Sequence, residues 1–206
     1  MRDEKIGDYL DQLADRVPAP GGGAAAALHA AVGAALLGMV ARYSTGEGYA
    51  AHQETISRII TEADELRGIA LRLAEADAEA FAAVTDAYRM PKSTEADTAA
   101  RSVALAQALV GAAWPPAQVI GIAGMVIDLA EALASIGNRN VASDVAAAAE
   151  AARAAAATAR VNVEINLASV TDAQASLEMI AEMDKVDAVI ARAEQVTATV
   201  REQIRG

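Results

Sequence analysis

A run of prolines and glycines that leads into a helix-forming segment is the first candidate for a binding element. Pro18-Ala19-Pro20-Gly21-Gly22-Gly23 precedes an alanine-rich apolar stretch that begins near Ala24. Proline disfavours helix before it, while glycine has no Cβ and lets the backbone come close to a ligand. The first amides of the following helix lack intrahelical acceptors and carry partial positive charge. The pattern is typical of a cradle for a carboxylate or another electron-rich group. A turn that merely starts a buried helix is the alternative.

Asp77 is the candidate for proton transfer. It interrupts a hydrophobic seam of alternating four- and three-residue steps, whose other members are Ile56, Ile59, Ala63, Leu66, Ala70, Leu73, Ala80, Val84 and Ala87. Glu75 and Glu79 lie roughly 200° away around the helix and therefore off the seam. A carboxylate removed from water tends towards a raised pKa, which suits proton transfer near neutral pH. The alternative is a buried Asp that pairs with an Arg or caps another helix.

Further polar groups lie late in the sequence. Gly137-Asn138-Arg139-Asn140, with Ser143 and Asp144 just beyond, concentrates hydrogen-bonding groups between two apolar helices. They would form either a pocket wall or plain helix caps. Asn162 and Asn166 lie one helical turn apart on a mostly apolar segment. This spacing favours an amide row that faces a polar pocket, or amides that satisfy each other or bond neighbouring helices.

The residues that usually bind metals do not form a recognisable motif. His29 and His52 have no partner at metal-ligand spacing, the acidic residues follow no ordered metal pattern, and the chain contains no cysteine. We therefore predict no metal. His29 is expected to be a hydrogen-bonded core histidine.

The composition favours one all-α domain over residues 1–206. Hydrophobic residues make up 54% of the chain but aromatic residues only 3%, and alanine, a strong helix former and poor strand former, dominates. The net charge of −11 argues against a nucleic acid as the main partner. No apolar segment typical of a secretion signal follows the N-terminus, so we expect a cytoplasmic protein. The apolar segment 24–41 lacks aromatic and basic anchors, so we expect a buried helix and no membrane span.

The expected elements follow from periodicity and from breakers. We predict a short amphipathic helix that contains Ile6, Leu10, Leu13 and Val17, then helices over 24–43 and 50–88. Thr94 and Asp97 predict a capping box, and Trp114-Pro115-Pro116 predicts a kink or two consecutive helices that end near Ile136. We expect Ser143 or Asp144 to cap a helix that runs to about 167, and Thr171-Asp172 to cap one last helix.

This last helix carries a second seam, formed by Met179, Met183, Val186, Ile190, Ala193, Thr197, Val200 and Ile204. Such seams bury against other helices, either within the chain or in a second copy of it.

Taken together, these motifs resemble the cyclodeaminase/cyclohydrolase family of folate one-carbon metabolism. The segment 18–23 matches the opening signature of the family, and Asp77 matches the aspartate that carries its acid/base role. Met90-Pro91-Lys92-Ser93-Thr94 resembles its Leu-Pro-Lys-Asn-Thr turn, and 137–144 resembles its Gly-Asn-x-Asn…Ser-Asp segment. Asn162 and Asn166 fall where the late helix of the family carries asparagines.

Two positions depart from the family pattern. Ala24 stands where members often have Ser. The family's Thr-x-Gly-Lys-Lys/Arg turn reads Thr45-Gly46-Glu47-Gly48 after Ser44, so that both basic residues are absent and one is replaced by an acid. Arg42 and Lys92 are the candidates that would supply the missing positive charge.

The resemblance implies an all-helical bundle that forms a homodimer and binds a tetrahydrofolate derivative as its substrate. It assigns Asp77 as the general acid/base. It also implies substrate-binding roles for a set of polar and glycine residues: Gly21, Gly22, Gly23, Lys92, Asn138, Asn140, Asp144 and Asn162.

The implied reaction is the hydrolysis of 5,10-methenyltetrahydrofolate to 10-formyltetrahydrofolate. Its sister reaction closes 5-formiminotetrahydrofolate to the methenyl form and expels ammonia. Both reactions pass through a tetrahedral carbon between N5 and N10 and need a proton shuttle. The absence of a formiminotransferase domain favours the cyclohydrolase. Two alternatives stay open: a scaffold redirected to another substrate, as Glu47 indicates, and a non-catalytic helical interaction protein in which Asp77 sets the packing register.

Overall fold

The computed structural model describes residues 3–205, and within this range the chain forms helices and no strand. This confirms the all-α prediction. The long helices are α2 (Gly22–Tyr43), α3 (Gln53–Arg89), α4 (Glu95–Ile136), α5 (Ala142–Leu167) and α7 (Val186–Arg205). The shorter elements are α1 (Ile6–Ala14), α6 (Ala173–Met183) and the 3₁₀ helices η1 (Glu47–His52) and η2 (Arg139–Val141).

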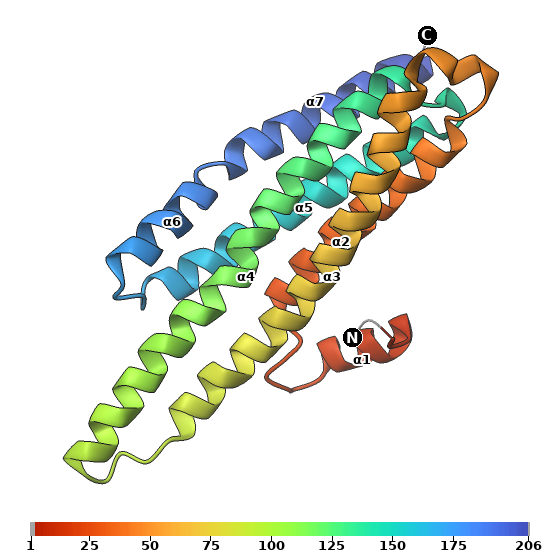
Figure 1. Cartoon of the computed structure of the whole chain (residues 1–206). Helices are drawn as coiled ribbons and strands as arrows, with labels where there is room; N and C mark the ends of the chain where they lie inside the picture. Colours follow the sequence, from red (N-terminus) through yellow and green to blue (C-terminus); the bar gives the residue numbers. More distant parts are fainter. Residues whose placement is uncertain (1–2, 206) are drawn as a thin grey trace.

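Helix α2 lies inside the bundle and contacts α3, α4 and α5 (Figure 1). Its apolar face is made of alanine, and Ala26, Ala27, Ala30 and Ala34 are fully buried. Because alanine side chains are short, neighbouring backbones can approach closely. At Gly33, an added Cβ would lie 3.1 Å from the carbonyl oxygen of Ala148 on α5. The segment expected to be a buried helix is therefore the centre of the fold.

Helices α3 and α4 form an antiparallel hairpin whose tip extends beyond α2 (Figure 1). The predicted capping box at the start of α4 is confirmed. The Asp97 amide donates to Thr94 Oγ1 at 3.0 Å, and the Thr94 amide donates to Asp97 Oδ2 at 3.1 Å. The α3 seam is buried as predicted from Ile56 through Leu73. This burial fixes the rotation of α3 about its own axis and hence the direction of Asp77.

Pro115 and Pro116 lie inside α4, which runs from Glu95 to Ile136 as one helix. Of the two predicted alternatives, the division into two helices is therefore wrong. Proline has no N–H, so these residues leave the carbonyls of Gly111 and Ala112 without their usual helical donors. Gly111 is exposed and can use water, but Ala112 is buried. Asn166 Nδ2 on α5 donates to the Ala112 carbonyl at 3.2 Å and replaces the missing donor. Bonding to a neighbouring helix, one of the alternatives considered for the late asparagines, is therefore the role of Asn166.

Replacement of Asn166 by Ala should destabilise the fold by about 1–3 kcal/mol, since a buried carbonyl loses its donor. Chemical denaturation with a two-state fit measures this change. The loss should shrink in a Pro116→Ala background, because residue 116 then donates to Ala112 itself. Equal losses in both backgrounds would contradict the explanation.

Several helix ends differ from the predicted ones. Helix α1 ends at Ala14 and leaves out Val17, since the residue before a proline is disfavoured in the helical region. Helix α2 begins at Gly22, two residues early, with Gly21 as its N-cap. Residues 47–52 form the 3₁₀ helix η1 ahead of α3. The expected caps Ser143 and Asp144 are wrong, because Val141 precedes α5 and makes no side-chain cap.

The predicted last helix is two helices, α6 and α7, separated by Asp184 and Lys185. Neither Gly nor Pro marks the break, which explains why the periodicity concealed it. The Asp172 cap is confirmed, since its Oδ1 accepts the Ala175 amide at 3.0 Å. Helix α6 packs mainly on α4 whereas α7 packs mainly on α5, so the break lets the chain change its packing partner.

Helices α2 and α4 are long and apolar enough to cross a membrane by composition alone. In the bundle, 61% of the most apolar window of α2 and 50% of that of α4 are buried against other helices. Core helices of globular bundles share this composition.

Candidate functional site

Asp77 lies against the first turn of α2. An added Cβ on Gly23 would be 2.0 Å from Asp77 Oδ1 and 2.5 Å from its carboxyl carbon, so no other residue type fits there without displacing the carboxylate. The backbone amide of Ala24 also donates to Asp77. The sequence predicted a close approach of this backbone to a ligand; at Gly23 the approaching group is the protein's own Asp77.

The environment of Asp77 acts on its pKa in two opposed ways. Burial raises the pKa of the carboxyl above its ordinary value, and the Ala24 amide offsets part of this rise by stabilising the carboxylate. The net direction is upward. Asp77 thus caps another helix, which was the alternative to a role in proton transfer. Its raised pKa also suits proton transfer, so the two roles are compatible.

Asn162 on α5 lies beside the same turn, at Gly22. An added Cβ on Gly22 would be 3.3 Å from Asn162 Nδ2. This nitrogen donates to the Thr158 carbonyl at 2.9 Å, which fixes the orientation of the amide. Gly21 has open space around the position of a Cβ and an extended backbone. The structure therefore brings Gly21, Gly22, Gly23, Asp77 and Asn162 together.

Tyr9 on α1 is a further buried residue, and no motif in the sequence marked it. Its side chain is only 7% exposed. Its hydroxyl is buried and has no hydrogen-bond partner among residues 3–205. Burial raises the pKa of Tyr9, and the negative charge of Asp77 raises it further. The signal available in the sequence was a hydroxyl-bearing aromatic residue between Ile6 and Leu13 on an otherwise aliphatic face.

Asn138, Asn140 and Asp144 lie at the opposite end of α2. The Asn138 amide donates to Ser44 Oγ at 2.8 Å, and its side-chain Nδ2 donates to the Tyr43 carbonyl at 2.9 Å. Its Oδ1 accepts the Asn140 amide at 3.0 Å. Because α2 has 22 residues, about 33 Å of helix separates this loop from the glycine turn. A single chain therefore does not bring these residues to Asp77, and substrate contact by them stays a prediction.

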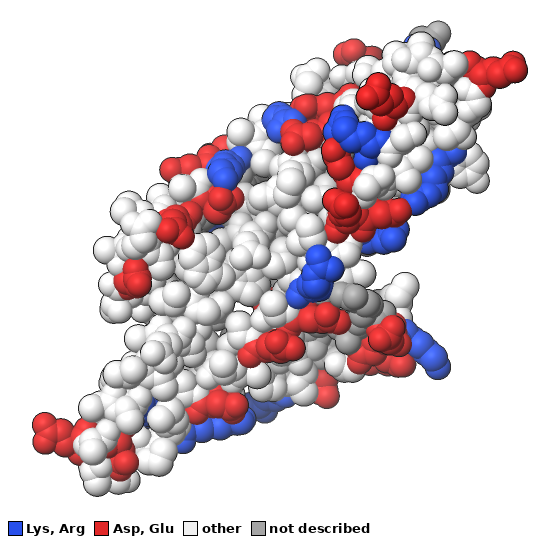
Figure 2. Space-filling view, in the orientation of Figure 1, with Lys and Arg blue, Asp and Glu red and all other residues white. Residues whose placement is uncertain are grey.

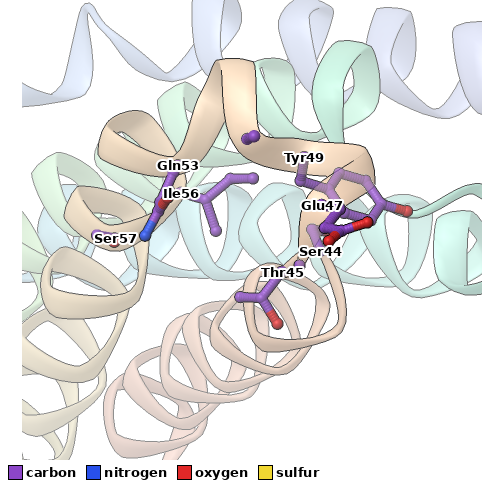
Figure 3. Close-up of a pocket in the computed structure, with 9 residues that line it drawn as sticks. Ser44, Thr45, Glu47, Tyr49, Gln53, Ile56 and Ser57 are labelled. Atoms are coloured by element: carbon purple, nitrogen blue, oxygen red, sulfur yellow. The ribbon is translucent and has the colours of Figure 1, made fainter.

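A cavity of about 330 Å³ lies at this second end of α2 (Figure 3). Glu47 and Tyr49 lie near Ser44 in this view, with Gln53 and Ser57 on the other side of Ile56. The cavity lining contains no Lys or Arg. Glu47, which stands where the family carries a basic residue, thus lies in a cavity wall.

The remaining candidates lie outside both regions. Lys92 is exposed on the turn between α3 and α4, 15 residues beyond Asp77. Arg42 pairs with Asp64 and donates to the Gly38 carbonyl. His29 is exposed on α2, so the expectation of a core histidine is wrong. Within residues 3–205 no group of three or more His, Asp or Glu side chains could hold a metal ion; the absence of a metal stays a prediction.

Comparison with known proteins agrees with the motif pattern. The profile of the formiminotransferase-cyclodeaminase family matches residues 5–185. The chain belongs to this family. The resemblance inferred from the sequence motifs is therefore confirmed.

Individual relatives of this formiminotransferase-cyclodeaminase family member cover most of the chain. The methenyltetrahydrofolate cyclohydrolase of Methylorubrum extorquens is 36% identical over 182 residues, 88% of each chain. The mouse formimidoyltransferase-cyclodeaminase is 33% identical over 84% of this chain, which spans 32% of the mouse protein. The crystal structure of formiminotetrahydrofolate cyclodeaminase from Thermotoga maritima superposes with a TM-score of 0.86 at 32% identity and covers 98% of both chains.

Replacement of Gly23 by Ala tests whether the close approach of Gly23 to the Asp77 carboxylate matters for activity. The new Cβ would overlap the Asp77 carboxylate, so Asp77 should be displaced and the Asp77-dependent activity should fall at least about tenfold, since catalytic groups tolerate little displacement. Gly68→Ala on α3 is the matched control, because its Cβ would meet only Arg72 at 3.6 Å. Steady-state kinetics compare the two variants. Wild-type turnover in Gly23→Ala would show that the contact does not matter.

Proposed function

We propose that the protein hydrolyses 5,10-methenyltetrahydrofolate to 10-formyltetrahydrofolate, with Asp77 as the general acid/base. The observation that carries the proposal is the position of Asp77 at the first turn of α2, where burial raises the pKa of its carboxyl. A carboxyl with a raised pKa can accept a proton in one step and return it in the next near neutral pH. The similarity over 88% of the chain to a protein named methenyltetrahydrofolate cyclohydrolase supports this choice of reaction.

In the proposed mechanism Asp77 acts twice. As a carboxylate it takes a proton from the water that adds to the methenyl carbon. As the resulting acid it protonates N5 while the bond between that carbon and N5 breaks. No metal or additional cofactor enters these two steps. The glycine turn positions Asp77, and Asn162, which lies beside Gly22, offers an amide oxygen to a polar edge of the folate.

Replacement of Asp77 by Asn should lower kcat by about 10²–10⁴-fold, because the amide cannot shuttle a proton. The Asn side chain keeps an oxygen that can accept the Ala24 amide, so the fold should survive. The loss of methenyl absorbance measures turnover. In the wild type, kcat/KM should fall on acidification through the raised pKa of Asp77, since the carboxylate is the form that accepts the first proton. Near-normal turnover in the variant would remove Asp77 from the mechanism.

The fold control for this variant is its stability as a function of pH. Because the folded-state pKa of Asp77 is raised, the contribution of this group to stability is fully present below its unfolded pKa and is lost as the pH rises through the folded one. Asp77→Asn should lack this decline and be at least as stable as the wild type at neutral pH.

The cyclodeaminase reaction is the second candidate. The 32%-identical structural neighbour is named for it, and it uses the same tetrahedral carbon and the same proton shuttle. Incubation with 5-formiminotetrahydrofolate separates the two: growth of methenyl absorbance with release of ammonia indicates a cyclodeaminase.

The acidic, lysine-free cavity at Glu47 favours a third candidate, a substrate other than folate. No change with either folate, together with no folate binding, would support that candidate or a scaffold.

We also propose that the protein acts in the cytoplasm as a homodimer. A groove of about 580 Å³ runs between the projecting parts of α3 and α4, and five of its nine lining residues are alanines. Grooves of small residues allow a further helix to approach closely. On the face shown in Figure 2, charged side chains border a broad uncharged area over α4 and α6. A second copy of the hairpin would fit this groove.

Light scattering after size exclusion should give twice the chain mass of 21.1 kDa. Ala83→Arg, which places a charge in the groove, should shift the protein to the monomer. Ser102→Arg is the matched control, because Ser102 is exposed on α4 and lies about 200° around the helix from the groove residue Ala104. A monomeric wild type would contradict the proposal.

A further inference from the structure

Phe81 lies on α3 one helical turn after Asp77. Residues four apart on a helix share a face, so the Phe81 side chain leaves α3 in nearly the same direction as the Asp77 carboxylate. Ala70 and Ala74 lie on this face as well, and both are fully buried. Phe81, in contrast, is 47% exposed. This face of α3 is therefore covered as far as Ala74 and partly open at Phe81.

The start of α2 explains why the cover of α3 ends there. Helices α2 and α3 run antiparallel, and α3 continues past the first turn of α2 (Figure 1). This first turn, at Gly23, is the part of α2 that lies against Asp77. Because α2 begins at Gly22, the helix does not reach the level of Phe81, which lies about 6 Å further along α3.

A ligand can reach the glycine turn from solvent. Gly22 is exposed, and the side chains of Asp77 and Asn162 are half-buried and not enclosed. An added Cβ on Gly21 would meet no atom within 4 Å, so there is open space at the N-cap of α2. The exposed part of the Phe81 ring thus lies one helical turn from a carboxylate that a ligand can approach.

Exposure of one apolar side chain is common and by itself indicates no function. Phe81 differs from such residues because it is the single phenylalanine of a chain in which aromatic residues make up 3%. Its neighbours along the helix are mostly alanines, at positions 78, 80, 82 and 83. Alanine would also favour the helix more than phenylalanine at an exposed position. Neither helix formation nor burial therefore accounts for an aromatic ring at this position.

We propose that Phe81 is a substrate-binding residue, whose ring packs against the conjugated rings that carry the methenyl carbon and holds this carbon at Asp77. This assignment rests on the proposed hydrolysis. In 5,10-methenyltetrahydrofolate, N5, the methenyl carbon and N10 share a positive charge. The face of an aromatic ring attracts a flat cation by stacking and by its quadrupole, which an aliphatic side chain lacks. The fused rings of the substrate are longer than one helical turn, so they can contact Phe81 while the carbon lies at Asp77.

Three substitutions at position 81 separate ring stacking from simple apolar contact. Phe81→Ala should raise KM for methenyltetrahydrofolate by about 10- to 100-fold, the range for removal of one stacking side chain. Phe81→Leu keeps an apolar side chain without a π face and should raise KM at least about threefold. Phe81→Tyr keeps the ring and should stay within about twofold of the wild type. In all three variants kcat should change by less than about threefold, because the ring binds the substrate and the transition state alike.

The matched control is Tyr43→Ala, since Tyr43 is 61% exposed but lies at the far end of α2. This variant should keep the wild-type KM. The melting temperatures of the position-81 variants should stay within about 4 °C of the wild type, because substitutions at exposed positions change stability little. Titration of methenyltetrahydrofolate in the Asp77→Asn background, where turnover is slow, should show the same loss of affinity on Phe81→Ala directly.

Two results would overturn the assignment of Phe81: a wild-type KM in Phe81→Ala, or a Phe81→Leu variant that binds as tightly as Phe81→Tyr. A fall in kcat at unchanged KM would also overturn it. A wild type that binds methenyltetrahydrofolate without hydrolysing it would overturn the proposed function alone, since the titrations still test the contact with Phe81. A wild type that does not bind this folate would overturn both.

Discussion

The Asp77 carboxylate lies on the first turn of α2 at a distance that only glycine at position 23 permits. Two features of the fold make this contact possible. Helix α3 must present Asp77 at one rotation, which its buried seam fixes. Helix α2 must begin at Gly22, which leaves the Ala24 amide free to bond the carboxylate. Helix α1 lies outside this contact, where Tyr9 lines a groove with residues of α2 and α3.

Features of the site that depend on local spacing could be predicted from the sequence, whereas contacts between distant segments could not. The seam of α3 and the capping box at Thr94 depend on residues a few positions apart, so their spacing alone predicted them. Contacts between distant segments left no such pattern. Neither the approach of Gly23 to Asp77 nor the bond from Asn166 to the Ala112 carbonyl can be read from local spacing. Tyr9 was not predicted for the same reason, since only the folded structure shows that its hydroxyl has no partner among residues 3–205.

The two ends of α2 have different chemical characters. The N-terminal end carries a carboxylate with a raised pKa, which suits proton transfer near neutral pH, and an amide whose orientation is fixed. The C-terminal end is closed by Asn138, whose backbone and side chain bond the last residues of the helix. Since Glu47 lies at this second end, the departure from the family's basic turn does not touch Asp77 or Asn162. The motifs alone could not separate the two ends of α2, because the family resemblance assigned residues from both ends to one substrate site.

The titration of the Asp77 carboxyl tests the central claim most directly. The carboxyl ¹³C resonance of Asp77, assigned by its absence from the spectrum of Asp77→Asn, can be followed as the pH is changed. Burial against α2 predicts a midpoint above the value of about 3.9 that is usual for Asp. A midpoint at or below that value would mean that the amides of α2 outweigh burial, and it would contradict a proton shuttle at this position.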